Sequence, residues 1–100
     1  MTSGFRILWT DHALSELEDT IAFLETNWTE KELRNLAIEI EKTIDLLSRN
    51  PLLFQSSDLN LAVRRVVVAK KNTLYYRING NTIEVLSFFS NRQNPQKRKI

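Results

Sequence analysis

The sequence predicts an α+β fold, in the order β-α-α-β-β-β, in which a helical hairpin packs on one face of a small antiparallel sheet. Three observations indicate this class. Two long stretches carry apolar residues at intervals of three and four, the spacing of amphipathic helices. Short stretches rich in β-branched and aromatic residues follow, and the last two are separated by Asn79-Gly80-Asn81, which favours a tight turn. A chain of 100 residues is also expected to form a single domain.

The first strand is expected over residues 5–9, because apolar and polar side chains alternate weakly there. Thr10 then caps a helix whose first turn contains Asp11, where the helix dipole favours a negative charge. Asn27 and Trp28 end this helix. One apolar stripe marks its buried face: Leu14, Leu17, Ile21, Leu24 and Trp28.

The second helix is predicted to begin with a capping box, in which Thr29 and Glu32 exchange hydrogen bonds with each other's backbone amides. It runs to about Arg49, and Asn50-Pro51 stops it because proline disfavours helical geometry in the residue before it. The short join between the helices forces an antiparallel hairpin. Six residues form the buried face: Leu33, Leu36, Ala37, Ile40, Ile44 and Leu47.

The rest of the chain alternates strands and turns. Residues 52–61 are predicted as a loop, 62–69 as a strand, and 70–72 as a turn. Residues 73–78 and 82–89 are predicted to form a hairpin. Three consecutive strands then make a meander, with one face covered by the helices and the other open.

The hairpin tip is either Asn79-Gly80 or Gly80-Asn81, and both choices give the same two faces. One face carries apolar residues and is expected to pack on the helices: Leu74, Tyr76, Ile78, Ile83 and Val85. The opposite face carries a mixed set: Tyr75, Arg77, Glu84, Leu86 and Phe88.

Charge is divided unevenly along the chain. Residues 1–60 hold five Lys/Arg against eleven Asp/Glu, a net charge of −6, whereas residues 61–100 hold nine against one, a net of +8. Residues 1–90 are expected to form the domain, and residues 91–100 a basic tail. A positive surface laid over strand sequence attracts polyanions or an acidic protein partner.

Composition excludes several classes of site. Without cysteine there is no disulfide, thiol nucleophile or thiolate metal site, and the single His12 cannot build a multi-histidine site. No metal or cofactor is therefore expected. The start of the chain lacks the pattern of a signal peptide, and no apolar run approaches the ~20 residues of a membrane span, so a cytoplasmic protein with no membrane contact is expected.

Several polar residues have both a structural and a functional interpretation. Arg64 and Arg65 are neighbours in a strand and point to opposite faces, and parity does not tell which one lies on the open face. Tyr76 is expected in the core. Tyr75 either has a functional role, stacking on a base or donating its hydroxyl, or is a half-exposed strand aromatic. His12 is expected to be a solvated surface residue. The acidic residues of both helices are expected on solvated faces: Glu16, Glu18, Asp19, Glu25, Glu39, Glu41 and Asp45.

Five stretches in register resemble the RelE/ParE superfamily of bacterial type II toxins, and the resemblance covers essentially the whole chain. They are Trp9-Thr-Asp-His-Ala-Leu14, Leu47-Ser-Arg-Asn-Pro51, Val63-Arg-Arg-Val-Val67, Leu74-Tyr-Tyr-Arg-Ile78, and residues 83–95. The resemblance implies a helical hairpin on a small antiparallel sheet, which agrees with the pattern-based prediction. It also implies a growth-inhibiting toxin that a co-expressed antitoxin neutralises.

The resemblance leaves two targets open. RelE-like members cut mRNA on the ribosome, whereas ParE-like members poison DNA gyrase. Arg65 and Arg92 match basic positions of the RelE-like pattern, and Tyr75 or a lysine is the candidate substitute for the general acid and base. Further cations are candidates for binding the target: Arg64, Lys70, Lys71, Arg77, Lys97, Arg98 and Lys99.

The nuclease set of the RelE-like pattern is incomplete in this sequence. No Tyr or His follows Arg92, and residues 51–61 lack the expected basic side chains. If the protein is an endoribonuclease, the reaction needs no metal: the ribose 2′-hydroxyl attacks the adjacent phosphate, and Arg65 and Arg92 stabilise the developing charge. The alternative is a non-catalytic nucleic-acid-binding protein or a degenerate family member.

The expected surface for the antitoxin is both apolar and cationic. Leu86 and Phe88 are predicted to be exposed on the open face, beside the basic C-terminal segment. An acidic amphipathic tail, folding as it binds, would satisfy both features and cover the arginines that act on the target.

Overall fold

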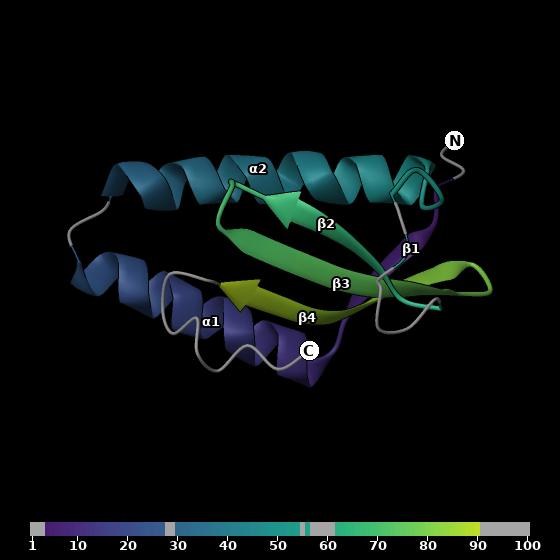
Figure 1. Ribbon diagram of the computed structural model, residues 1–100, viewed down its shortest axis with the longest axis horizontal. Coiled ribbons are helices and arrows are strands. Elements are labelled where there is room, and N and C mark those ends of the chain that lie inside the picture. Colours follow the sequence, from purple (N-terminus) through teal and green to yellow (C-terminus); the bar gives the residue numbers. More distant parts are fainter. Residues whose placement is uncertain (1–3, 28–29, 55, 57–61, 91–100) are drawn as a thin grey trace.

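A computed structural model describes residues 4–27, 30–54, 56 and 62–90, and Figure 1 shows the arrangement. The elements follow the predicted order, and the α+β class is confirmed: two helices pack on a four-stranded sheet. Figure 1 shows α2 running along the β2 side of the sheet and α1 along the β4 side. The bounds are β1 Arg6–Trp9, α1 Asp11–Thr26, α2 Glu30–Arg49, β2 Arg64–Val68, β3 Asn72–Asn79 and β4 Thr82–Ser90.

The sheet is mixed rather than wholly antiparallel. Its strand order is β1-β4-β3-β2. The three later strands form the predicted antiparallel meander. β1 adds to the outer edge of β4 in the parallel direction, from Arg6 opposite Thr82 to Trp9 opposite Val85. The first strand therefore pairs with the last one, across almost the whole length of the chain.

Thr10 caps α1 as predicted and also fastens the helix to the sheet. Its hydroxyl accepts a hydrogen bond from the Ala13 amide at 3.3 Å, which satisfies one of the unpaired amides at a helix start. The same hydroxyl donates to the Val85 carbonyl at 2.8 Å, and the Thr10 amide donates to that oxygen at 3.1 Å. One side chain thus fixes where β1 ends and α1 begins.

The buried stripe of α1 is rotated from the prediction. Leu24 is buried, but Leu14 is 41% exposed. Ala13 and Thr20 occupy the centre of the buried face instead. The small Ala13 side chain lets the first turn lie close to the sheet, and the Thr20 hydroxyl donates to the Glu16 carbonyl at 3.0 Å, so burial does not leave this hydroxyl unpaired.

The buried face of α2 agrees better with its prediction. Leu36 and Leu47 are buried and the other predicted leucine and isoleucines are partly buried, but Ala37 is exposed and Thr43 takes a buried position. The helix ends at Arg49, before Asn50-Pro51, as predicted. Trp28 and Thr29, the first residue of the proposed capping box, lie outside the described residues.

A β-bulge in β4 overturns the predicted placement of Phe88. Tyr76 pairs with Val85 but Tyr75 pairs with Ser87, so Leu86 is an extra, unpaired residue. The alternation shifts beyond this point, and Phe88 pairs with Leu74 in the core, with no exposed surface. The prediction assumed an unbroken period of two and placed Phe88 on the open face, which is wrong.

Both turns of the meander use positive φ angles. Asn79 pairs with Thr82, so Gly80-Asn81 is the hairpin tip, and Gly80 has a φ of +62° that suits glycine. The turn between β2 and β3 places Ala69 and Lys70 at φ values of +52° and +68°. Lys71 follows Lys70, and both lysines are exposed at this end of the sheet.

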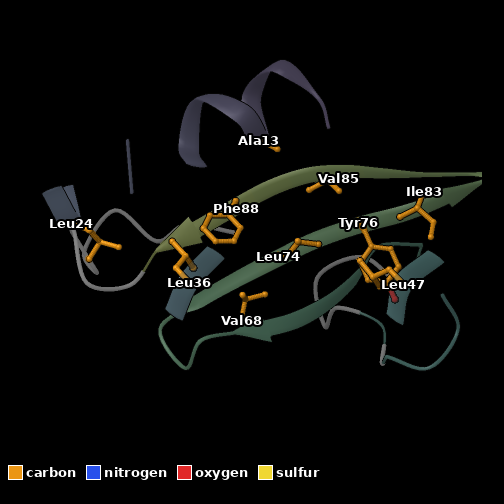
Figure 2. Close-up of a cluster of buried hydrophobic side chains, with 10 residues drawn as sticks. All are labelled: Ala13, Leu24, Leu36, Leu47, Val68, Leu74, Tyr76, Ile83, Val85 and Phe88. Carbon is orange, nitrogen blue, oxygen red and sulfur yellow. The ribbon is translucent and has the colours of Figure 1, made fainter. Parts of the chain in front are cut away.

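The core lies between the helices and one face of the sheet, and Figure 2 shows its fully buried members. Tyr76 and Leu47 lie toward one end of this cluster, and Leu24 toward the other. Trp9 packs against it from β1, with its ring centroid 6.3 Å from that of Phe88. The buried set is Ala13, Leu24, Leu36, Leu47, Val68, Leu74, Tyr76, Ile83, Val85 and Phe88.

Replacing Thr10 tests the joint between β1 and α1. Thr10→Ala removes both the helix cap and the bond to the Val85 carbonyl, and we expect it to lower the free energy of unfolding by about 1–2 kcal/mol. Thr10→Ser keeps the hydroxyl and should retain most of this stability. Urea denaturation followed by circular dichroism measures both; equal losses in the two variants would contradict the assigned role of the hydroxyl.

Candidate functional site

The strand register separates the two neighbouring arginines. Arg64 pairs with Tyr76, a core residue, and therefore lies on the helix side of the sheet. Its guanidinium donates to the Phe54 carbonyl at 2.6 Å and so holds the segment that follows α2. Arg65 pairs with Tyr75 on the opposite, open face. Of the two arginines, only Arg65 is placed to meet a target there.

Tyr75 lies on the open face, as predicted, where Arg65 is its cross-strand partner, but its side chain is not free. Ser87 pairs with it from β4, and only 8% of the tyrosine is exposed. A base therefore finds little ring surface on which to stack.

Tyr76 is a core residue, as predicted. It has no exposed surface, and its hydroxyl donates to the Pro51 carbonyl at 2.6 Å. Burial raises the pKa of Tyr76 to about 12, although the nearby Arg64 charge acts in the opposite direction. The tyrosine is therefore a protonated structural donor under physiological conditions.

Arg77 is paired with a carboxylate. Its guanidinium donates to Glu84, its cross-strand neighbour, and the Asn79 side-chain amide donates to the other carboxylate oxygen at 3.2 Å. These hydrogen bonds, with the Arg77 charge, hold the pKa of Glu84 below its usual value. Much of the Arg77 charge is thereby neutralised before any target arrives.

Three cations in β2 and just after it have no carboxylate partner among the described residues. Arg65 is half-buried in β2, and Lys70 and Lys71 are exposed at the turn that follows. Between them, Val67 leaves 62% of its surface exposed. We call these four residues, Arg65, Val67, Lys70 and Lys71, the cationic patch. The other predicted cations, Arg92, Lys97, Arg98 and Lys99, lie outside the described residues.

Glu16 is a polar anchor that the sequence prediction missed. Instead of facing solvent, its carboxylate accepts hydrogen bonds from the Ser87 hydroxyl at 2.6 Å and the Phe88 amide at 2.8 Å. His12, one helical turn earlier and 69% exposed, places its Nε2 atom 3.4 Å from the same oxygen. Helical spacing alone gave no signal for this contact, because its partners are 71 and 72 residues away.

The described cations can bind anions. The cationic patch can hold phosphates or carboxylates. Within the described ranges, no group of three or more side chains could hold a metal ion, and no helix is long and apolar enough to cross a membrane.

Comparison with known proteins decides the family. The model of the family described as "ParE toxin of type II toxin-antitoxin system, parDE" matches residues 7–95. This chain belongs to the ParE toxin family. The RelE/ParE resemblance is thereby confirmed, and a cognate antitoxin is the partner that this family implies. No curated protein matches the chain in sequence.

A solved structure of the chromosomal ParDE TA system from P. aeruginosa has a similar fold. The TM-score is 0.72, at 16% sequence identity, over 86% of this ParE-family chain and 95% of that chain. At this identity the likeness shows the fold alone.

Two tyrosines that are neighbours in the sequence give a matched test of the site's geometry. Tyr76→Phe leaves the buried Pro51 carbonyl without its donor, and we expect a loss of about 1–3 kcal/mol in the free energy of unfolding. Tyr75 makes no hydrogen bond with another described residue, so Tyr75→Phe should change it by less than about 0.5 kcal/mol. Chemical denaturation of both variants measures the difference; a Tyr75→Phe loss as large as that of Tyr76→Phe would contradict the assignment.

The Glu84 pair predicts a dependence of stability on pH. Its pKa is lowered in the folded state, so the unfolded chain binds more protons at acid pH. The stabilisation is complete above the unfolded pKa and is lost as the pH falls through the folded one. Glu84→Gln should therefore show a flatter decline in unfolding free energy between pH 5 and pH 3. Identical slopes for the variant and the wild type would contradict this.

Proposed function

We propose that this chain is the growth-inhibiting toxin of a type II toxin–antitoxin pair and that it acts by binding a protein target, DNA gyrase, rather than by cutting mRNA. Family membership supports the first part. The observation that carries the second is the state of three predicted site residues. The candidate catalytic Tyr75 is buried, and two candidate RNA-binding cations are engaged within the fold: Arg64 lies on the helix side, and Arg77 is paired with Glu84.

RNA cleavage through the ribose 2′-hydroxyl needs a proton acceptor and a proton donor beside the phosphate. Among the described strand residues of the open face, the ionisable candidates are Glu84 and Tyr75. The lowered pKa of Glu84 makes its carboxylate a weaker base, and its oxygens already accept from Arg77 and Asn79. Lack of each proton-transfer group costs roughly 10²–10⁴-fold in rate. Arg65 alone would stabilise charge without moving a proton.

The cationic patch suits a protein target better than a scissile phosphate. Its cations flank an apolar side chain, Val67, that is 62% exposed. An arginine beside apolar surface is typical of the residues that contribute most to protein interfaces. Lys70 and Lys71 at the rim would speed the approach of an acidic partner more than they would strengthen the final complex.

The same patch supports neutralisation by direct occlusion. An acidic antitoxin segment that lies across the open face would cover Arg65 and so remove it from the target. Leu86, half-buried at the bulge, and Val67 supply apolar contacts for such a segment, in place of the buried Phe88.

Induction of the gene in a bacterial host, with and without the neighbouring reading frame, tests the function. We expect growth arrest only without the neighbour. Purified protein should produce gyrase-dependent DNA breaks in a supercoiling assay, while primer extension on cellular mRNA shows no new 5′ ends. Normal growth would contradict a toxin, and new 5′ ends with intact gyrase activity would instead indicate a nuclease.

Arg65→Ala tests the role of the cationic patch in this activity. We expect roughly tenfold weaker gyrase poisoning, the effect of losing an interface arginine worth about 1.4 kcal/mol. Arg34→Ala removes the same side chain from the outer surface of α2, where 72% of it is exposed, and should leave poisoning unchanged. If circular dichroism shows that both variants are folded and they poison gyrase equally, Arg65 does not contribute to target binding.

A further inference from the structure

An apolar pocket lies at the C-terminal end of α2, away from the cationic patch. Its volume is about 440 Å³, within the range of ligand-binding pockets. The β3–β4 hairpin contributes Ile78 and Gly80, and the segment before β1 contributes Phe5. The end of α2 and the segment after it contribute Arg49, Pro51, Leu52 and Leu53.

The loop that forms this pocket is held from several sides. The Tyr76 hydroxyl donates to the Pro51 carbonyl at 2.6 Å, and Arg64 donates to the Phe54 carbonyl at 2.6 Å. Between these two points, the Leu53 amide donates to the Asn50 carbonyl at 3.0 Å. Hydrogen bonds from two strand side chains therefore fix both ends of the loop.

Two leucines nevertheless face solvent on this fixed loop. Leu52 is 69% exposed and Leu53 is 62% exposed, beside a pocket whose lining is mostly apolar. Neither leucine belongs to the hydrophobic core, so core packing gives no reason for apolar side chains at these two positions. Exposed apolar surface next to a pocket marks an interaction site.

Charge indicates which kind of partner fits. Arg49 is the charged residue of the lining, and its guanidinium lies 3.3 Å from Asp45 in an exposed pair that contributes little. A second copy of this chain would bring two Arg49 side chains together, and two leucines cover far less than the ~800 Å² per partner of a stable interface. A segment that carries one apolar side chain next to a carboxylate matches the pocket.

We propose that the cognate antitoxin inserts an apolar side chain into this pocket and places a neighbouring carboxylate against Arg49. The antitoxin is the partner that the family implies, and it would cover Leu52 and Leu53 while the toxin is held inactive. Ile78 in the pocket directly follows Arg77 of the open face in β3, so one extended segment can pass around the hairpin tip from one surface to the other. This inference rests on the proposed function only for the existence of the antitoxin.

Titration of purified toxin with the product of the neighbouring reading frame, followed by calorimetry, tests the pocket. Leu53→Asp should weaken antitoxin binding roughly 30-fold or more, as loss of an interface anchor does. Arg49→Ala should weaken it several-fold. Ile38→Asp is the matched control, because Ile38 is 46% exposed on α2 and eleven residues before Arg49, about 16 Å away. Its affinity should stay within twofold of the wild type.

The same variants, induced without antitoxin, separate this inference from the proposed function. Leu53→Asp should still arrest growth, because the pocket does not belong to the target surface. Unchanged antitoxin affinity in Leu53→Asp would overturn the proposal. The proposal would also be overturned if Leu53→Asp failed to arrest growth but bound the antitoxin with full affinity, because the pocket would then contact the target. A wild-type chain that binds antitoxin in the calorimeter without arresting growth would refute the toxin function and leave the pocket assignment standing.

Discussion

Strand β4 has to satisfy its outer edge with two different partners, and much of the architecture follows from this constraint. β1 is four residues long and reaches only as far as Val85. Beyond it, Glu16 of α1 accepts the hydrogen bond of the Phe88 amide. Thr10 connects the two partners, because it caps α1 and bonds to the Val85 carbonyl. An edge covered in this way offers no row of free amides to another chain.

The fold was predictable because local sequence patterns mark its helices and its hairpin. The features that were missed have no such local pattern. Periods of three to four residues mark the helices, and Asn79-Gly80-Asn81 marks the hairpin. The bulge at Leu86 breaks the period of two without any glycine or proline to announce it, so Phe88 was assigned to the wrong face. The Glu16 contact joins residues 71 positions apart, and helical spacing by itself describes that carboxylate as solvated.

The division between Arg64 and Arg65 is a case in which the sequence held a usable signal. Three residues, 69–71, separate β2 from β3. When the turn has an odd number of residues, each even-numbered residue of one strand pairs with an even-numbered residue of the other. Arg64 must then pair on the face of Tyr76, whose core role was predicted. What could not be predicted is the use that the structure makes of Arg64. Its acceptor, the Phe54 carbonyl, belongs to a loop without periodicity.

The two faces of the β2–β3 pair therefore have separate tasks although their residues alternate along the same strands. On the helix side, Arg64 and Tyr76 hold the loop after α2 and so shape the apolar pocket. On the open side, Arg65 remains without a carboxylate partner in the described part of the chain, as do Lys70 and Lys71 at the turn. Because alternate side chains point in opposite directions, a substitution on one face leaves the contacts of the other in place. Contact with the target through Arg65 and the shape of the pocket proposed for the antitoxin can therefore change independently at neighbouring positions.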